Sequence, residues 1–153
     1  MKYLSIFVLC AITATAHGSD EVSTAIDHYF DDFNRGMPAL DLVKTHWHPE
    51  SVIFTSDGVV LFGGYEESGG WMRGIQASIA ENGWVRSEVM ESTVCNLGDT
   101  LALYSMNFRR VFSDGSETIS GGIYTLAKSD KWRIASLTVA SPDSLVRCDD
   151  PDA

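Results

Sequence analysis

The pattern of apolar and polar positions predicts helices in the first half of the chain and strands in the second half. Between residues 21 and 35, apolar side chains recur at intervals of three and four residues, and acidic residues with one histidine occupy the other positions. This period is typical of an amphipathic helix with one buried face. Gly36 follows at once, and a glycine just past the last periodic residue predicts that the helix ends there.

A second, shorter helix is predicted to begin at Pro38, because the fixed backbone of proline suits the first turn of a helix. Its buried stripe is formed by Leu40, Val43 and Trp47. The residue before a proline avoids helical geometry, so this helix is expected to end just before Pro49.

A hairpin is predicted for residues 51–62, where two apolar runs flank an Asp-Gly turn. Residues 65–81 return to helical spacing. Two adjacent glycines, Gly69 and Gly70, interrupt that pattern, so we expect either one kinked helix or two short ones.

The remainder of the chain predicts four consecutive strands, because apolar, β-branched and aromatic residues run between short turns rich in glycine, serine and aspartate. The strands are expected over residues 85–96, 100–112, 117–128 and 131–140. Their connections are too short for crossovers, which makes an antiparallel meander. Helices that precede such a sheet indicate an α+β domain.

The pattern of residues 1–16 is typical of a secretory signal peptide and does not predict a part of the folded domain. Lys2 supplies a positive charge, an apolar run follows, and the residues up to Ala16 form a small-x-small cleavage site. The apolar run is too short to remain as a membrane span. We therefore expect cleavage after Ala16 and a secreted or periplasmic protein with no membrane segment, built as a domain over residues 17–140 and an acidic tail over residues 141–153.

Composition excludes one class of partner and leaves the state of the cysteines open. The chain of 153 residues carries a formal charge of −10, which disfavours binding to the phosphate backbone of nucleic acids.

Two cysteines lie beyond the predicted signal peptide, Cys95 at the end of a strand and Cys148 in the tail. Export permits a disulfide between them, but their presence alone does not prove that they pair.

Three motifs, taken in order, resemble the nuclear transport factor 2-like superfamily, which includes SnoaL-like polyketide cyclases, ketosteroid isomerase and scytalone dehydratase. They are HPESVIF at the helix-to-strand junction, GDT in a later turn, and GIYTLAKSDKWRIAS across the last two strands. The resemblance covers nearly all of residues 20–140. It implies a cone-shaped half-barrel, with N-terminal helices packed on a strongly curved, mixed or antiparallel sheet around an apolar pocket. Many members also form homodimers through the outer face of the sheet.

The functional residues of these relatives carry over only in part. Tyr29 matches the tyrosine on the first helix of the ketosteroid isomerases, but their catalytic aspartate falls near Thr55, which is no base at neutral pH. Many cyclase-like relatives have histidines where this chain has Ser136 and Thr138. The resemblance therefore implies a fold without assigning a reaction, since the superfamily uses this cone for enzymes and for non-catalytic binders.

Strand alternation predicts which side chains line the concave face of the sheet and the pocket. With residues from the helices and the hairpin, the expected lining is Phe33, Trp47, Phe54, Tyr104, Met106, Phe108, Arg110, Ile123, Thr125, Trp132, Ser136 and Thr138. The opposite face is expected to be apolar enough for a homodimer interface. A one-residue bulge would exchange the two faces locally.

Three residues are candidates for acid–base chemistry: Tyr29, His46 and Glu91. Glu91 would accept a proton if its strand buried it, since burial raises the pKa of a carboxyl group. The alternative is that its register places it outside, in water. His46 and His48 suggest a metal motif, but residues two apart on a helix diverge by roughly 200°. We therefore expect no metal ion, and no cofactor.

Three functions remain open from the sequence. The first is binding of a small apolar or polyketide-like molecule without turnover. The second is an isomerase, dehydratase or cyclase that acts on a small apolar, polyketide-like or steroid-like substrate by acid–base chemistry. The third is a module that holds another protein against the outer face of the sheet.

Overall fold

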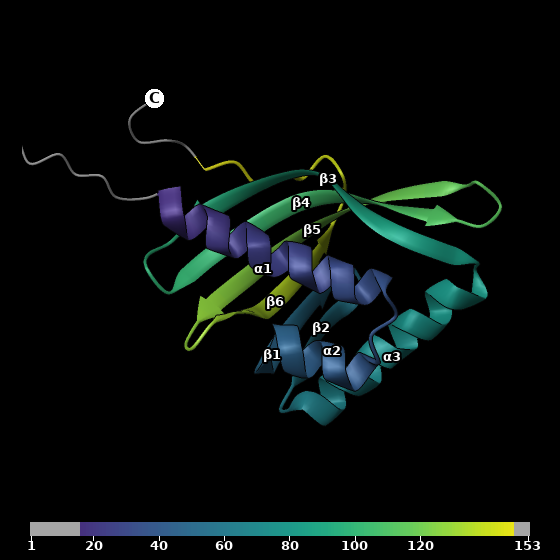
Figure 1. The fold of residues 1–153 in the computed structure, drawn as a ribbon, viewed down its shortest axis with the longest axis horizontal. Helices are drawn as coiled ribbons and strands as arrows, with labels where there is room; N and C mark the ends of the chain where they lie inside the picture. Colours follow the sequence, from purple (N-terminus) through teal and green to yellow (C-terminus); the bar gives the residue numbers. More distant parts are fainter. Residues whose placement is uncertain (1–15, 149–153) are drawn as a thin grey trace, which may run out of the picture.

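The protein is described by a computed structural model over residues 16–148, in which three helices pack with one six-stranded sheet (Figure 1). The elements are α1 (Ala16–Asn34), α2 (Ala39–His46), β1 (Trp47–Thr55), β2 (Gly58–Phe62), α3 (Tyr65–Glu81), β3 (Trp84–Asn96), β4 (Leu101–Phe112), β5 (Glu117–Lys128) and β6 (Trp132–Ala140). This order confirms the predicted α+β domain. The predicted signal peptide, apart from Ala16, and the last five residues of the predicted tail lie outside the described residues.

The six strands form one sheet in the order β2-β1-β6-β5-β4-β3. Strands β3 to β6 make the predicted antiparallel meander, and β1 with β2 makes the predicted hairpin. Strand β1 also pairs with β6 in parallel, which makes the sheet mixed. This pairing brings the first and last strands of the domain together and joins the hairpin to the meander.

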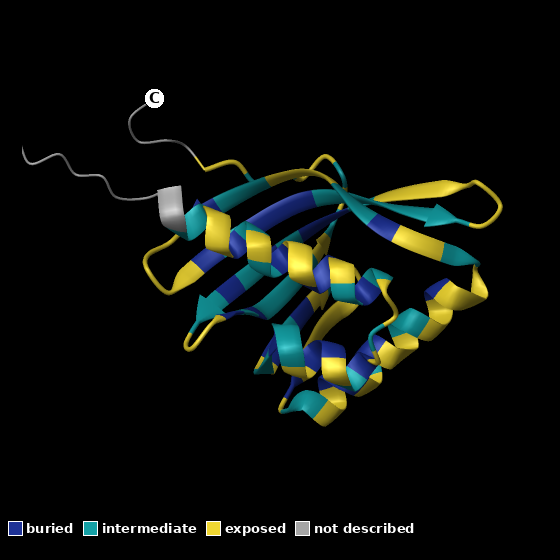
Figure 2. Cartoon of the chain, in the orientation of Figure 1, coloured by how far each residue is buried: buried dark blue, intermediate teal, exposed yellow. Residues whose placement is uncertain are grey.

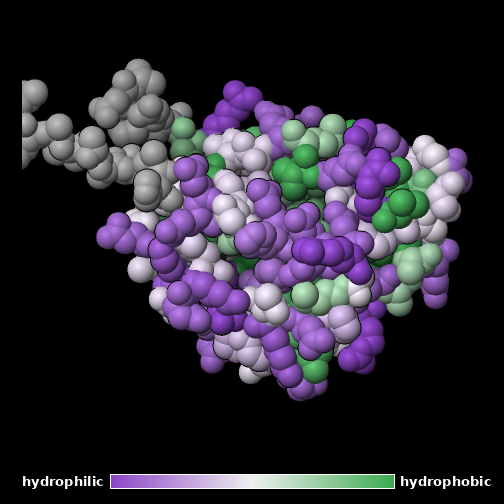
Figure 3. All heavy atoms as spheres, viewed as in Figure 1, coloured by the Kyte–Doolittle hydropathy of each residue, from purple (hydrophilic) through white to green (hydrophobic). Residues whose placement is uncertain are grey.

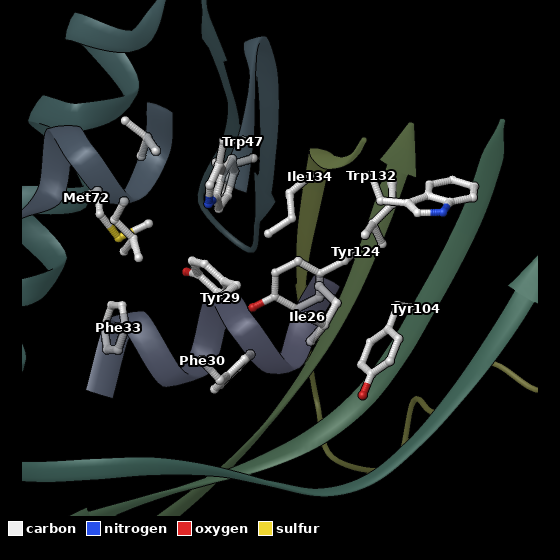
Figure 4. Packing of buried hydrophobic residues seen from close by; sticks show 14 of the residues in the cluster. Ile26, Tyr29, Phe30, Phe33, Trp47, Met72, Tyr104, Tyr124, Trp132 and Ile134 are labelled. Carbon is white, nitrogen blue, oxygen red and sulfur yellow. The ribbon is translucent and has the colours of Figure 1, made fainter. Parts of the chain in front are cut away.

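The helices cover one face of the sheet, called here the inner face and defined by Tyr104, Tyr124 and Ile134. Helix α1 lies across β3, β4 and β6, while α2 packs between α3 and β1 (Figure 1). Buried and exposed residues alternate along α1 (Figure 2), and its buried side chains join those of the inner face in one core (Figure 4). The buried residues of α1 are those that the spacing of three and four selected: Val22, Ile26, Tyr29, Phe30 and Phe33.

The side of the molecule that carries α1 is mainly hydrophilic, with small, separate apolar patches (Figure 3). This agrees with the amphipathic pattern of residues 21–35, whose acidic positions point to solvent. No helix within residues 16–148 combines the length and the apolar content that a membrane span requires.

The second helix ends two residues earlier than predicted. Helix α2 stops at His46, and Trp47 is already extended, with φ −107° and ψ 155°. Trp47 also pairs with Ile134 of β6, so the extended geometry required before Pro49 continues back to Trp47. Trp47 is therefore buried as a strand residue and not as part of a helical stripe.

The two adjacent glycines do not interrupt the third helix. Helix α3 runs without a break from Tyr65 to Glu81. Gly69 is buried where α3 meets α2, and a β-carbon there would lie 3.1 Å from Leu40 Cδ1 and 3.4 Å from Leu40 Cα. Gly70 faces solvent, and a β-carbon there would have no neighbour within 4 Å. A close helix–helix contact thus explains Gly69, whereas nothing in the structure explains Gly70.

The register of β5 differs from the predicted register by one residue. At the end of β4, the N–H of Phe112 donates to the carbonyl of Ser116 at 3.0 Å, and this pair encloses a three-residue loop that ends on Gly115, whose φ of +83° suits such a loop. A one-residue change exchanges both faces of a strand. Tyr124 therefore lies opposite Tyr104 on the inner face. The prediction that Ile123 and Thr125 line the concave face is wrong, because both point outward.

A bulge in β6 exchanges the faces a second time. The pairing with β5 shifts by one residue next to Ala135. Before the bulge, Trp132 lies on the inner face, as predicted, and is buried. Beyond it, Ser136 and Thr138 point outward, and the hydroxyl of Ser136 donates a hydrogen bond of 2.8 Å to Thr125 Oγ1 on the outer face. Their predicted place in the pocket is therefore wrong as well.

The segment that follows β6 crosses the outer face of the sheet. Val146 donates its backbone N–H to Ser105 Oγ at 2.9 Å. Cys148 forms a disulfide with Cys95 of β3, and their Cα atoms are 5.7 Å apart, a normal span for such a bond. The pairing that the sequence left open is thus present, and it fastens the start of the tail over β3 and β4.

Candidate functional site

A cavity of about 260 Å³ lies between the helices and the inner face of the sheet. Its walls come from α1, α3 and strands β3 to β6. Aromatic and aliphatic side chains form most of the lining, and the polar groups are two tyrosine hydroxyls, two serine hydroxyls, one indole N–H and one guanidinium. The cone is therefore not filled by its own side chains.

Four of the residues predicted for the site line this cavity, and four others are buried in the core without lining it. The lining residues are Tyr29, Phe33, Phe108 and Arg110. The core residues are Trp47, Tyr104, Met106 and Trp132. Helical spacing selected Tyr29 and Phe33, and alternation placed Phe108 and Arg110 on one face of β4, which was assigned to the concave side for its larger side chains.

Five predicted lining residues do not reach the cavity. Four of them, Ile123, Thr125, Ser136 and Thr138, point outward for the reasons of register given above. Phe54 is 41% exposed, because its neighbour Ile53 is the residue of β1 that faces the core. Phe54 pairs with Thr138 on the outer face.

The sequence missed most of the remaining wall. The unpredicted lining residues are Phe30, Trp71, Met72, Ile75, Ser87, Ser120, Gly121, Tyr124, Leu137 and Val139. Tyr124, Leu137 and Val139 of this set were on the face assigned to the outside, whereas Gly121 was on the face assigned to the concave side. Gly115 was the available signal, since a glycine at the end of a three-residue loop would have given the correct register.

Two tyrosines from different elements meet at the cavity (Figure 4). The ring centroids of Tyr29 on α1 and Tyr124 on β5 are 6.3 Å apart, in an edge-on arrangement. Burial raises the pKa of both phenols, and the nearby charge of Arg110 opposes that rise only in part. Both hydroxyls therefore stay protonated at physiological pH and offer hydrogen-bond donors to the cavity.

Arg110 supplies the only guanidinium among the described residues of the lining. Its Cζ lies 5.2 Å from the centroid of the Phe108 ring, within the range of a cation–π contact. Its Nε is buried and has no hydrogen-bond partner within residues 16–148. No carboxylate of the described chain forms an ion pair with it.

The end of α1 is held to β3 beside the cavity by one asparagine. Asn34 Nδ2 donates to the carbonyl of Ser87 at 2.8 Å, and Asn34 Oδ1 accepts from the Ser87 N–H at 2.8 Å. The Ser87 hydroxyl also accepts a hydrogen bond of 3.1 Å from Trp84 Nε1. These contacts fix the wall that α1 and β3 share.

Glu91 is not in the cavity. The pairing of β3 with β4 shifts between Val89 and Glu91, and Glu91 stands opposite Asn107 on the outer face. Its side chain is exposed, which is the alternative that the sequence left open. The sheet therefore separates Glu91 from Tyr29, and the two cannot exchange a proton through the cavity.

His46 does not line the cavity either. Its Nε2 is 2.9 Å from Asp32 Oδ2, and its ring centroid is 5.7 Å from that of Tyr29. A carboxylate only accepts hydrogen bonds, so the neutral ring carries its proton on Nε2. Burial lowers the pKa of His46, and the opposing effect of Asp32 is smaller. The ring is therefore neutral at pH 7.

His46 opens onto a separate surface groove of about 780 Å³, formed by α1, the end of α2 and the turn between β5 and β6. Some of its charges form ion pairs: Asp32 contacts Arg35 at 2.9 Å at the end of α1, and Glu21 of α1 contacts Lys128 of β5 at 2.6 Å. The second pair and the bond between Asp32 and His46 join α1 to its neighbours, which gives the groove a structural role.

The histidine pair does not form a metal site. His46 belongs to α2 and His48 to β1, where the ring of His48 contacts the backbone of Glu50. Within residues 16–148, no three side chains of the metal-binding types His, Cys, Asp and Glu converge.

The comparison that decides the family covers most of the domain. The family described as NTF2-like protein (DUF6841) matches residues 20–142. The protein belongs to this NTF2-like family. A search of curated proteins found no significant match. Membership confirms the superfamily that the three sequence motifs indicated.

Solved structures of this fold agree with the assignment. A domain of unknown function from Nostoc punctiforme, described with a cystatin-like fold, has a TM-score of 0.65 at 19% identity, over 83% of this chain and 78% of that chain. An NTF2-like protein of unknown function from Pseudomonas putida has a TM-score of 0.67 at 14% identity, over 84% and 89%. A ketosteroid isomerase-like protein from Erwinia carotovora has a TM-score of 0.56 at 16% identity, over 82% and 96%. At these identities the likeness shows the fold alone.

Proposed function

We propose that this NTF2-like protein binds a small, mainly apolar molecule in the cavity and does not transform it by acid–base chemistry. The observation that carries the proposal is the composition of the wall. The described residues around the cavity include neither a carboxylate nor an imidazole. Both lining tyrosines stay protonated because burial raises their pKa. No lining group is therefore a general base near neutral pH.

The shape of the site supports binding. Small-molecule sites are usually preformed, mostly apolar cavities with a few polar groups that orient the ligand. Here aromatic rings from α1, α3 and β4 surround the space, and a handful of donors face it. Transfer of an apolar ligand from water into this space is favourable because it removes apolar surface of both partners from water.

The enzymatic alternative has less support. It needs Tyr29 to work with Glu91 or His46, but Glu91 is exposed on the other side of the sheet and His46 bonds to Asp32. The likeness to a ketosteroid isomerase-like protein concerns the fold and brings no proton acceptor to the cavity.

The proposal is tested by filling the cavity. Ser120 lines it from β5, so Ser120→Phe places a ring in the space, whereas Ile119→Phe places the same ring at an exposed position on the outer face of the same strand. Calorimetric titration with 1-octanol, indole and 2-naphthol should show binding to the wild type and to I119F, and loss of binding to S120F. Equal binding to S120F would place the ligand elsewhere, and no binding by any of the three proteins would contradict the proposal.

We also propose export, on the basis of the apolar N-terminal run and its cleavage motif. Helix α1 begins at Ala16, so cleavage after Ala16 leaves that helix nearly whole. N-terminal sequencing of the protein recovered from the periplasm or medium should start at His17.

The homodimer through the outer face of the sheet remains a prediction. The tail occupies part of that face, so light scattering must show whether two copies still associate there.

A further inference from the structure

Two adjacent arginines on β4 have opposite surroundings. Arg109 points to the outer face and forms ion pairs with Glu88 and Glu117. Arg110 points into the cavity, and no carboxylate of the described chain pairs with it. Arg109 thus has acidic partners, whereas Arg110 is partly buried and has none within residues 16–148.

The cavity leaves the charge of Arg110 under-compensated. A guanidinium has five N–H donors and is always charged, so partial burial is unfavourable unless acceptors are available. The Phe108 ring provides a cation–π contact, but the buried Nε lacks any partner within residues 16–148. An anionic ligand would satisfy this group directly, and its oxygens match the planar fork of a guanidinium.

The other polar groups of the cavity favour the same charge. Tyr29 and Tyr124 line the same cavity as Arg110, and burial raises the pKa of both phenols. Both remain protonated donors. The remaining polar groups of the side chains are the hydroxyls of Ser87 and Ser120 and the indole N–H of Trp71. No described lining residue on any of the surrounding elements is acidic, so nothing there would repel an anion.

We propose that the cavity takes a small organic monocarboxylate, with the carboxylate on Arg110 and an aryl or medium-chain alkyl body among the aromatic rings. The inference rests on the proposed binding function and names its ligand class. The volume of about 260 Å³ corresponds to about nine water-sized groups at roughly 30 Å³ each. That space suits a chain of about eight carbons or a single ring with a short side chain.

The test compares three ligands with the same eight-carbon chain and different head groups. Octanoate, 1-octanol and octylammonium are titrated into the wild type by calorimetry at pH 7.5. Octanoate should bind at least about 10-fold more tightly than 1-octanol, as expected of a charge-assisted hydrogen bond, and octylammonium should bind least. This comparison needs no variant, so it stands even where a substitution harms folding.

Variants then assign the preference to one side chain. Arg110→Met should weaken octanoate binding by about 10- to 100-fold and leave 1-octanol binding nearly unchanged, while Arg110→Lys should keep part of the preference for the anion. Arg109→Met, which removes the neighbouring charge from the other face, should keep the full preference. The thermal midpoint of each variant identifies those that are folded.

The outcomes separate this inference from the proposed function. If the wild type binds 1-octanol as tightly as octanoate, or if R110M keeps the preference for octanoate, the inference is overturned while a binding cavity stands. If R109M loses the preference as fully as R110M, long-range charge and not cavity contact is responsible, which also overturns it. If none of the three ligands binds, the proposed function fails and this inference fails with it.

Discussion

A pair of valine substitutions at the two adjacent glycines of α3 tests the helix–helix contact that frames the cavity. Gly69 is buried against α2, where a β-carbon would lie 3.1 Å from Leu40 Cδ1 and 3.4 Å from Leu40 Cα. Gly70 is exposed, and its β-carbon would have no neighbour within 4 Å. Replacement of glycine by valine in a helix interior gains about 0.3 kcal/mol or more of helix propensity at either position.

Only one of the two variants adds a packing cost. The branched side chain of Gly69→Val extends beyond the β-carbon toward the backbone of α2, and overpacking of a filled interface costs about 1–3 kcal/mol. Gly70→Val should therefore be as stable as the wild type or slightly more stable, and Gly69→Val should be less stable than G70V by about 1–3 kcal/mol. Because Trp71, Met72 and Ile75 line the cavity from this helix, G69V should also weaken ligand binding.

Urea unfolding followed by circular dichroism measures both free energies of unfolding, with equal slopes required for a valid comparison. Gly69→Ala is a milder third variant, because only its β-carbon must be accommodated. If G69V and G70V unfold at the same urea concentration, α2 and α3 do not approach as closely as the structure shows. A lower stability for G70V than for G69V would contradict the reasoning altogether.

Three further predictions concern contacts on which the site depends. Burial lowers the pKa of His46, so this ring takes up a proton at a higher pH in the unfolded chain than in the folded chain. The free energy of unfolding should therefore fall as the pH drops from 7 toward 5, by at most about 1.4 kcal/mol per pH unit from this group. His46→Gln should show a shallower fall over that range in parallel urea titrations, and an unchanged slope would rule out the contribution of His46. Asn34→Ala removes two hydrogen bonds to the backbone of Ser87 and should lower the free energy of unfolding by about 2 kcal/mol. Asn34→Asp should keep the bond to the N–H and lose the bond to the carbonyl. Equal stability of N34A and wild type in thermal unfolding would refute a stabilising role for these two bonds. Cys148→Ser removes the disulfide that closes a loop with a sequence separation of 53, and the loop-entropy argument predicts a loss of about 3–5 kcal/mol in the free energy of unfolding. Mass spectrometry of the oxidised wild type should find no free thiol on Cys95, and a free thiol there would contradict the disulfide.

The sequence by itself determined the elements and the class of the fold. Spacing of three and four residues selected the buried face of α1, and short turns required β3 to β6 to form a meander. These features are local, since they depend on side-chain period and on connection length. The same locality explains why Tyr29 and Phe33 were placed correctly and why Phe108 and Arg110 were placed on a common face, because the period of each element groups them.

Only the tertiary structure decided which strand residues face the cavity. The left-handed Gly115 set the register of β5, and the bulge at Ala135 set that of the second half of β6. Each moves the register by one residue, and strands have a period of two, so each error exchanges a whole face. The cavity wall is therefore decided by where a loop glycine and a bulge fall, and a pattern of apolar residues does not record either.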